Sequence, residues 1–187
     1  MAYFGLSTPV IAKLDTAKNT YSEGLVLSKL IGTNITPQYA EGSLYCDNAL
    51  GYHEKVFKEG DISLETDSVP LKAGELLFGH TVDDTSTHSE ISKTDDTPNY
   101  VGYGFIGTER LSDGTQKFIA CWLPKCQFVE NGEDIKTRGD SITFGTHKLT
   151  GKCFGNHEKI WRKKQQFDTE TEALEFLKKE ANIVGGP

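Results

Sequence analysis

The stretch that most constrains the fold is residues 100–128, where side-chain size alternates along the chain. Val101, Tyr103 and Phe105 fall on one side of an extended backbone, while Gly102 and Gly104 fall on the other. A strand face without side chains either weakens the strand or allows another element to approach closely. We therefore expect a central strand against which a second element lies on the glycine side.

The same stretch continues as the second strand of a hairpin. Residues 107–114 are a polar turn region containing Asp113-Gly114, and residues 118–123 are apolar on both faces, as in a buried strand. Pro124 has no N–H to donate, so strand pairing should end or bulge there. Residues 102–107 fit G-x-G-x-x-G, but they lie inside a strand and so do not indicate a dinucleotide site.

Length and charge define the class of protein. A chain of 187 residues is expected to form one domain, residues 1–187, with a substantial core. The net charge of −7 comes from residues 61–98, where nine acids face two lysines; the remainder has 18 of each sign. No general attraction to nucleic acid or membrane is expected, and the absence of a long apolar run suggests synthesis as a cytosolic protein.

The acidic residues include a strand with two different faces. Ile62 and Leu64 alternate with Asp61, Glu65 and Asp67, which predicts one apolar face and one acidic face. The simplest interpretation is a solvated face that keeps the protein soluble. A functional role for the acidic face is the alternative.

Local patterns predict the remaining elements. Pro70 and Gly79 bound a short helix, and Thr169 with Glu172 forms a capping box that opens a C-terminal helix within residues 169–183. Residues 1–14 suit an N-terminal arm or edge strand, residues 25–31 a strand, and residues 38–53 an extended loop. The chain is thus predicted to be mainly β, with two packed antiparallel sheets, a short helix and a C-terminal helix.

No catalytic, cofactor or metal site is expected. The sequence has no local nucleophile–base pair and no Gly-rich loop leading into a helix. His80, Asp83, Asp84 and His88 could bind a metal only if a loop-forming stretch made them converge. The four cysteines, Cys46, Cys121, Cys126 and Cys153, include no C-x-x-C pair, so we expect reduced thiols in strands.

Seven segments, in order along nearly the whole chain, resemble the major tail protein of long-tailed, non-contractile bacteriophages. The sequence departs from the family pattern at Cys46, where a small residue is expected. The segments are residues 5–14 (GLSTPVIAKL), 43–47 (SLYCD), 57–64 (FKEGDISL), 77–80 (LFGH), 98–105 (PNYVGYGF), 122–128 (WLPKCQF), and Trp161 with residues 171–173 (TEA).

This resemblance implies a tail-tube fold and a structural, non-enzymatic role in the virion. Such subunits form hexameric rings that stack into a tube, assembled in the host cytoplasm with tape-measure and tail terminator or initiator proteins. Genomic DNA passes through without specific binding, and an acidic wall would withhold contacts from its phosphates. On this basis we expect Asp61, Glu65 and Asp67, with Glu54 or Glu90 as further candidates, to face the lumen; the acidic strand could instead lie on the outer wall.

Assembly would follow from surfaces left unpaired in one subunit. Neighbouring sheets could complete one another at their edges, and we expect residues 38–53 and the N-terminal arm to make contacts between rings. The alternative is a monomeric β-barrel that binds a small ligand or carbohydrate, or processes a sugar. In that case Tyr100, Tyr103 and Trp122 would line its pocket.

Overall fold

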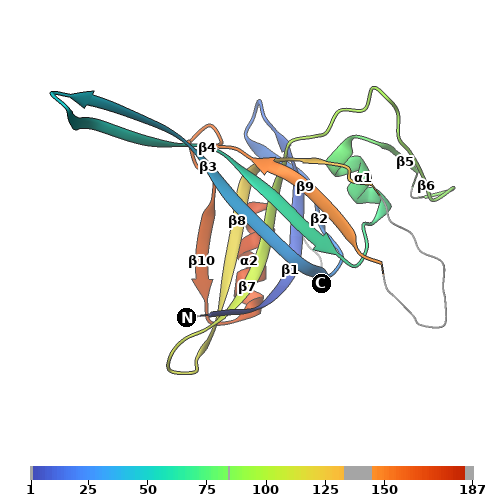
Figure 1. Ribbon diagram of the computed structural model, residues 1–187. Helices are drawn as coiled ribbons and strands as arrows, with labels where there is room; N and C mark the ends of the chain where they lie inside the picture. Colours follow the sequence, from blue (N-terminus) through green and yellow to red (C-terminus); the bar gives the residue numbers. More distant parts are fainter. Residues whose placement is uncertain (1, 84, 133–144, 184–187) are drawn as a thin grey trace, which may run out of the picture.

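The computed structural model of the chain is a mainly antiparallel β-structure with two helices (Figure 1). It describes residues 2–83, 85–132 and 145–183. The main sheet has the order β2-β1-β7-β8-β9-β4-β3, with β10 also paired to β8, and β5 and β6 form a separate pair. The elements are β1 (Ala2–Asp15), β2 (Thr20–Val26), β3 (Leu30–Cys46), β4 (Ala49–Thr66), α1 (Leu71–Phe78), β5 (Thr81–Asp83), β6 (Ser89–Ile91), β7 (Val101–Arg110), β8 (Gln116–Val129), β9 (His147–Cys153), β10 (Lys163–Phe167) and α2 (Glu170–Glu180).

The main sheet folds over itself at β8 and so builds two packed layers. Residues 118–122 of β8 pair with β10, whereas residues 126–129 pair with β9. Between these two halves, the register of β8 against β7 shifts between Leu123 and Cys126, so the predicted bulge at Pro124 is confirmed. The β9-β4-β3 layer therefore crosses one face of the β2-β1-β7-β8-β10 layer (Figure 1).

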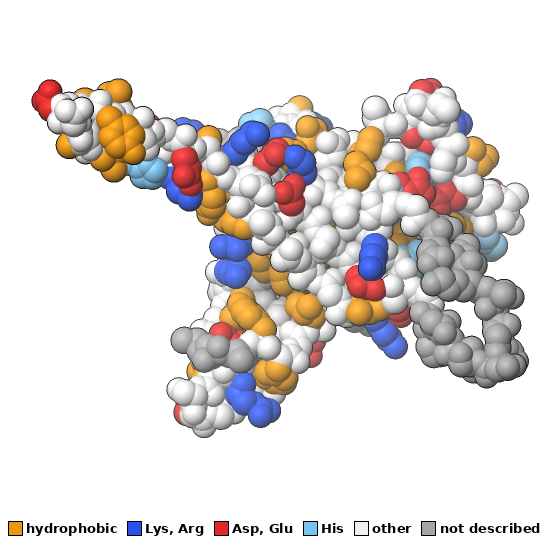
Figure 2. Space-filling model, viewed as in Figure 1, with side chains coloured by type: hydrophobic (Ala, Val, Ile, Leu, Met, Phe, Trp, Pro, Cys, Tyr) orange, Lys and Arg blue, Asp and Glu red, His pale blue; other side chains and the backbone are white. Residues whose placement is uncertain are grey.

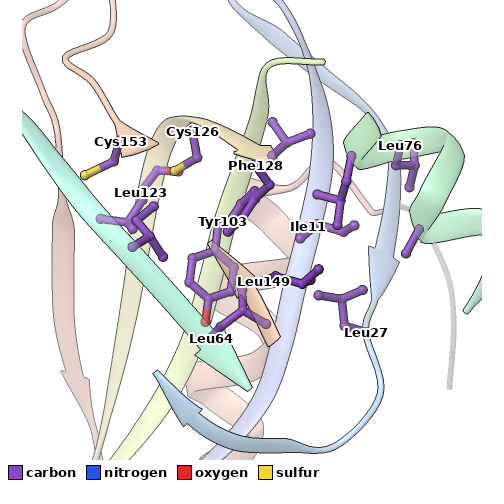
Figure 3. Close-up of a cluster of buried hydrophobic side chains, with 14 of the residues drawn as sticks. Ile11, Leu27, Leu64, Leu76, Tyr103, Leu123, Cys126, Phe128, Leu149 and Cys153 are labelled. Carbon is purple, nitrogen blue, oxygen red and sulfur yellow. The ribbon is translucent and has the colours of Figure 1, made fainter. Parts of the chain in front are cut away.

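The first core fills the space between the two β layers (Figure 3). Ile11, Tyr103 and Leu123 from one layer meet Leu64 and Leu149 from the other, and all are buried. The Tyr103 hydroxyl donates to Thr33 Oγ1 at 3.1 Å, which satisfies its polar tip where β3 crosses. Two antiparallel layers around one core confirm the predicted sandwich architecture.

The second core lies between the central layer and α2. Trp122 and Leu177 are fully buried there. A Cβ at Gly104 would lie 2.6 Å from Trp122 Cε3 and 2.8 Å from Leu177 Cδ2, and one at Gly102 would lie 2.2 Å from Trp122 Cζ2. The bare strand face predicted from the sequence thus accommodates a tryptophan and a helix.

Both helices begin and end where the sequence predicts. Pro70 precedes α1, and Gly79 ends it in the left-handed region with φ 78°. Thr169 accepts a hydrogen bond from the Glu172 N–H while the Glu172 side chain accepts one from the Thr169 N–H, which completes the capping box of α2. Within the described residues, neither helix is long and apolar enough to cross a membrane.

Two sequence predictions are wrong, and a third is only partly right. Residues 25–31 are not one strand, because the chain leaves β2 at Val26 and enters β3 at Leu30, and this corner carries it from one layer to the other. Residues 38–53 are not a loop, because they form the end of the long β3–β4 hairpin. The N-terminal segment is a strand, but it is neither an arm nor an edge strand, because β1 is paired with both β2 and β7.

Candidate assembly surfaces

The most exposed feature is the distal part of the β3–β4 hairpin, residues 38–56, which we call the arm. Every residue of the arm is exposed, and it projects well beyond the body (Figures 1 and 2). At about 3.3 Å per residue it is about 30 Å long. Among the described residues, six of the twelve exposed large hydrophobic side chains belong to it: Tyr39, Leu44, Tyr45, Leu50, Tyr52 and Val56.

The arm presents apolar side chains on both faces. Leu44 lies opposite Tyr52, and after a register shift Tyr45 lies opposite Leu50 on the other face. Tyr45 is 69% exposed and Tyr52 is 72% exposed. A two-stranded ribbon without a layer to pack on is at best marginally stable in water, so this arm is suited to burial against another surface.

A sequence signal for the arm is present at its tip. Asp47 and Asn48 connect the two strands and have φ values of 52° and 62°, the left-handed conformation of a two-residue hairpin turn. Asp and Asn tolerate this conformation better than most residues. The dipeptide could have identified the hairpin, but the apolar residues on both sides of it lack the alternation of a strand that covers a core.

The base of the arm is fixed to the body by aromatic side chains. Phe57 stacks on Trp161, with ring centroids 4.5 Å apart and planes at 11°, and Tyr39 meets Phe57 edge-on at 6.1 Å. The Arg162 guanidinium lies 4.3 Å from the Trp161 ring centroid on the same stack. These contacts hold the direction in which the arm leaves the body.

The structure separates the three acidic residues expected in a lumen. Asp61 and Glu65 lie on the outward face of β4, opposite the buried Ile62 and Leu64, so the two-faced strand predicted from the sequence is confirmed. The outward face is not purely acidic, because in the strand register β9 places Lys152 beside Asp61 and Lys148 beside Glu65. Figure 2 shows acidic and basic side chains close together in this region.

Lys152 offsets part of this acidity through a specific contact. Its Nζ lies 2.6 Å from Glu59 Oε1 and 4.0 Å from Asp61 Oδ1. Asp61 also accepts a hydrogen bond from Gln38 Nε2 at 3.0 Å. The outward surface of β3, β4 and β9 is therefore a weakly acidic, mixed-charge surface.

Asp67 has a different role, at the corner between the two layers. Its carboxylate accepts hydrogen bonds from the Ser28 hydroxyl and, at 2.8 Å, from the Lys29 N–H. The Ser28 hydrogen bond is the main cause that lowers the pKa of Asp67 below its usual value, with a further contribution from the Lys29 N–H. Asp67 thus fixes the turn that takes the chain from β2 into β3, a contact between distant segments that no local pattern reveals.

The other acids of residues 61–98 do not form one surface with β4. The Asp83 carboxylate accepts hydrogen bonds from the Ser86 hydroxyl and from the backbone N–H groups of Ser86 and Thr85. These contacts, the Ser86 hydroxyl foremost, lower the pKa of Asp83. Glu90 lies 2.5 Å from the buried His80 Nδ1, and Asp84 is outside the described residues. Acidity that is continuous in sequence is thus divided between β4 and the β5–β6 region.

The described residues do not form the ligand pocket of the alternative interpretation. Tyr103 and Trp122 are fully buried on opposite faces of the central layer, so they cannot line one pocket. A hollow of about 440 Å³ lies instead over β4 and β9, where polar residues such as Asn34, Asp61 and Lys152 and apolar residues such as Val129 and Phe154 line it. Within the described parts of the chain, no cluster of three or more His, Cys, Asp or Glu residues is arranged to hold a metal ion.

The cysteines are free thiols in strands, as expected from their spacing. Cys46 is exposed near the tip of the arm, whereas Cys121, Cys126 and Cys153 are buried. Burial raises the pKa of Cys121 and of Cys153 to about 11, and that of Cys126 is also well above its ordinary value. The buried thiols are therefore part of the packing and are poor nucleophiles.

Comparison with known proteins adds little information about function to the geometry described above. No family model matches the sequence, and no curated protein does. Among solved structures, the chain is similar to one described as "Cryo-EM structure of the anti-feeding prophage cap (AFP tube terminating cap)", at 8% identity and a TM-score of 0.35, covering 85% of this chain and 88% of that one. A likeness this distant carries no functional argument, which must come from the surfaces described above.

Proposed function

We propose that this protein is a structural subunit of a phage tail tube, with copies that close into hexameric rings and stack into a conduit for DNA. The observation that carries the proposal is the arm, which exposes apolar side chains on both faces and has no layer of its own to cover. The role is structural rather than enzymatic. The site of action is the virion, after assembly in the host cytoplasm.

The arm supports self-assembly because the same chain offers both an extended apolar ribbon and unpaired sheet edges. In the described sheet, β2 and β3 are at the two ends of the strand order and β10 pairs only with β8. Repeated head-to-tail contacts between identical subunits close into rings or continue as filaments, according to the rotation between copies. The resemblance of seven sequence segments to phage major tail proteins also supports assembly into rings that stack as a tube.

In the proposed tube, the outward face of β3, β4 and β9 lines the lumen. Asp61 and Glu65 face outward on β4, and their acidity is reduced but not reversed by the neighbouring lysines. A weakly acidic wall offers DNA few cationic partners, so the duplex slides without specific binding. Tape-measure and terminator or initiator proteins complete the tail in this proposal.

Electron microscopy of concentrated protein tests the proposed assembly. The wild-type chain should form rings and tubes, alone or when supplied with the other tail components. Tyr45→Thr with Tyr52→Thr should prevent tubes, while Ile91→Thr, a change at a 54% exposed residue on β6, should preserve them. A wild-type protein that stays monomeric under both conditions contradicts the proposal.

Charge reversal on β4 tests the lumen assignment separately. Virions carrying Asp61→Lys and Glu65→Lys should form tubes of normal length but eject DNA more slowly, because added cations bind phosphate. The control is Glu175→Lys, which changes an exposed acid on α2, in the layer opposite β4. Ejection at the normal rate from the β4 variant would remove this face from the lumen.

A further inference from the structure

A second apolar surface lies on the central layer, on the side that the β9-β4-β3 layer only partly covers. We call it the open face and define it by Tyr3, Leu6, Phe105 and Ile119. Tyr3 is 58% exposed and the other three are half-buried. In Figure 2, hydrophobic side chains gather over the lower parts of β7, β8 and β10, below the crossing of β3.

The strand register places these side chains on one surface. Leu6 lies opposite Gly107, Gly107 lies opposite Ile119, and Phe105 lies opposite Cys121. Phe105 is two residues from Tyr103, so it points to the same side as the first core. It packs against the edge of that core and remains only half-buried. The open face is thus a continuation of the core surface without its covering layer.

Gly107 keeps the open face flat. A Cβ at this position would lie 3.1 Å from Tyr3 Cε1, so the Tyr3 ring lies directly over the glycine. Two adjacent strands contribute apolar side chains on either side of this ring, Leu6 from β1 and Ile119 from β8. A flat apolar surface spanning several strands can accept a ribbon laid across it.

The charges around the open face are complementary to those of the arm. Arg162, just before β10, and Lys164, on β10, are exposed, and Lys164 pairs in register with Cys121 next to the open face. The arm carries Glu41, Asp47 and Glu54 against Lys55, a net charge of 1 − 3 = −2. Opposite charges at the rim of an apolar contact favour the correct orientation and speed association.

We propose that the open face receives the arm of a second copy of this chain. The arm projects away from the open face of its own molecule, so the contact is between copies (Figure 1). The contact is heterologous, because one copy contributes the arm and the other the open face. It can therefore repeat from copy to copy, in a closed ring or along a filament. The inference rests on the proposed self-assembly and names the receiving surface.

A complementation experiment tests this pairing. The arm-defective variant is Tyr45→Thr with Tyr52→Thr, and the face-defective variant is Tyr3→Ser with Ile119→Thr; the threonines keep side chains suited to strands. One variant is affinity-tagged, mixed with an untagged partner and captured. Circular dichroism and thermal unfolding confirm that each variant is folded before mixing.

The tagged arm-defective variant should capture the untagged face-defective variant at least about tenfold more than either variant captures an untagged copy of itself. Any contact through sheet edges is present in all three mixtures, so the excess measures only the arm on the open face. Equal capture in the three mixtures overturns the inference. If capture is equal but the wild type forms tubes, the proposed function stands and only the pairing of arm and open face is overturned. If capture is in excess but the wild type forms no tubes, the pairing stands and the proposed tube function is overturned.

Discussion

Two hairpins of this protein have the same secondary structure and opposite surroundings. β7 and β8 form the centre of the molecule, with eight of the ten residues of β7 buried, whereas the arm of β3 and β4 is exposed throughout. Both are antiparallel pairs with local register shifts. The difference shows that strand pairing alone does not determine how a hairpin is used. The central hairpin is covered over most of its length by its own chain, whereas the arm is available to another chain.

The largest difference should appear when a large aromatic side chain is removed from each hairpin. Trp122→Ala in β8 leaves a cavity between the central layer and α2, and should reduce the free energy of unfolding by about 3–5 kcal/mol. Tyr52→Ala in the arm should change it by less than about 0.5 kcal/mol. Denaturant unfolding of the isolated subunit measures both, and similar losses would remove the distinction between the hairpins.

Glycines provide a smaller and more specific contrast. Gly104→Ala places a methyl group 2.6 Å from Trp122 Cε3 and should cost about 1–3 kcal/mol of stability. Gly42→Ala in the arm meets no atom within 4 Å and should be neutral. Thermal unfolding of the two variants measures both changes in stability. A Gly104→Ala protein as stable as the wild type would mean that α2 is not packed against β7 as described.

The corner that leads into the arm's first strand should respond to acid. Because the folded pKa of Asp67 is depressed, its carboxylate contributes stability that is fully present above its unfolded value of about 3.8 and is lost as pH falls through the folded pKa. Asp67→Asn should lower the melting temperature at neutral pH, and the gap from wild type should narrow below about pH 4. A gap that is constant with pH would show that the charge of Asp67 does not stabilise the corner.

The smallest expected effect is on the stability of the arm variant itself. Tyr45→Thr with Tyr52→Thr removes two side chains that are mostly exposed, so unfolding of the subunit should shift by no more than about 0.5 kcal/mol. Loss of assembly in a subunit of unchanged stability would assign the two tyrosines to contacts between copies. A large loss of stability would mean instead that the arm packs on its own body.

The sequence predicts those parts of the molecule whose pattern is local. The bare face of β7, the capping box of α2 and the ends of α1 each depend on residues close together in the chain, and all three predictions are confirmed. The corner at residues 27–29 depends on Asp67, which is nearly forty residues away from Ser28 and Lys29. No period in the sequence could reveal that contact.

The sequence pattern also does not indicate that residues 38–56 form a hairpin. Alternation identifies strands that cover a core, but Leu44 and Tyr45 are adjacent apolar residues on opposite faces of a ribbon that covers none. The grouping of the acids was also misleading, because the lysines that offset Asp61 and Glu65 come from β9, far along the chain. Burial and charge of a surface depend on strand order, which local sequence does not specify.

Hydrogen exchange on the arm is the most direct test of the central claim, that residues 38–56 form a contact which only another copy completes. In the isolated subunit, the backbone amides of the arm should exchange much faster than those of β7 and β8, because the ribbon is open on both faces. In assembled material the same amides should become protected, while those of β7 and β8 change little. Arm amides that are already protected in the isolated subunit, or that stay unprotected after assembly, would contradict the account.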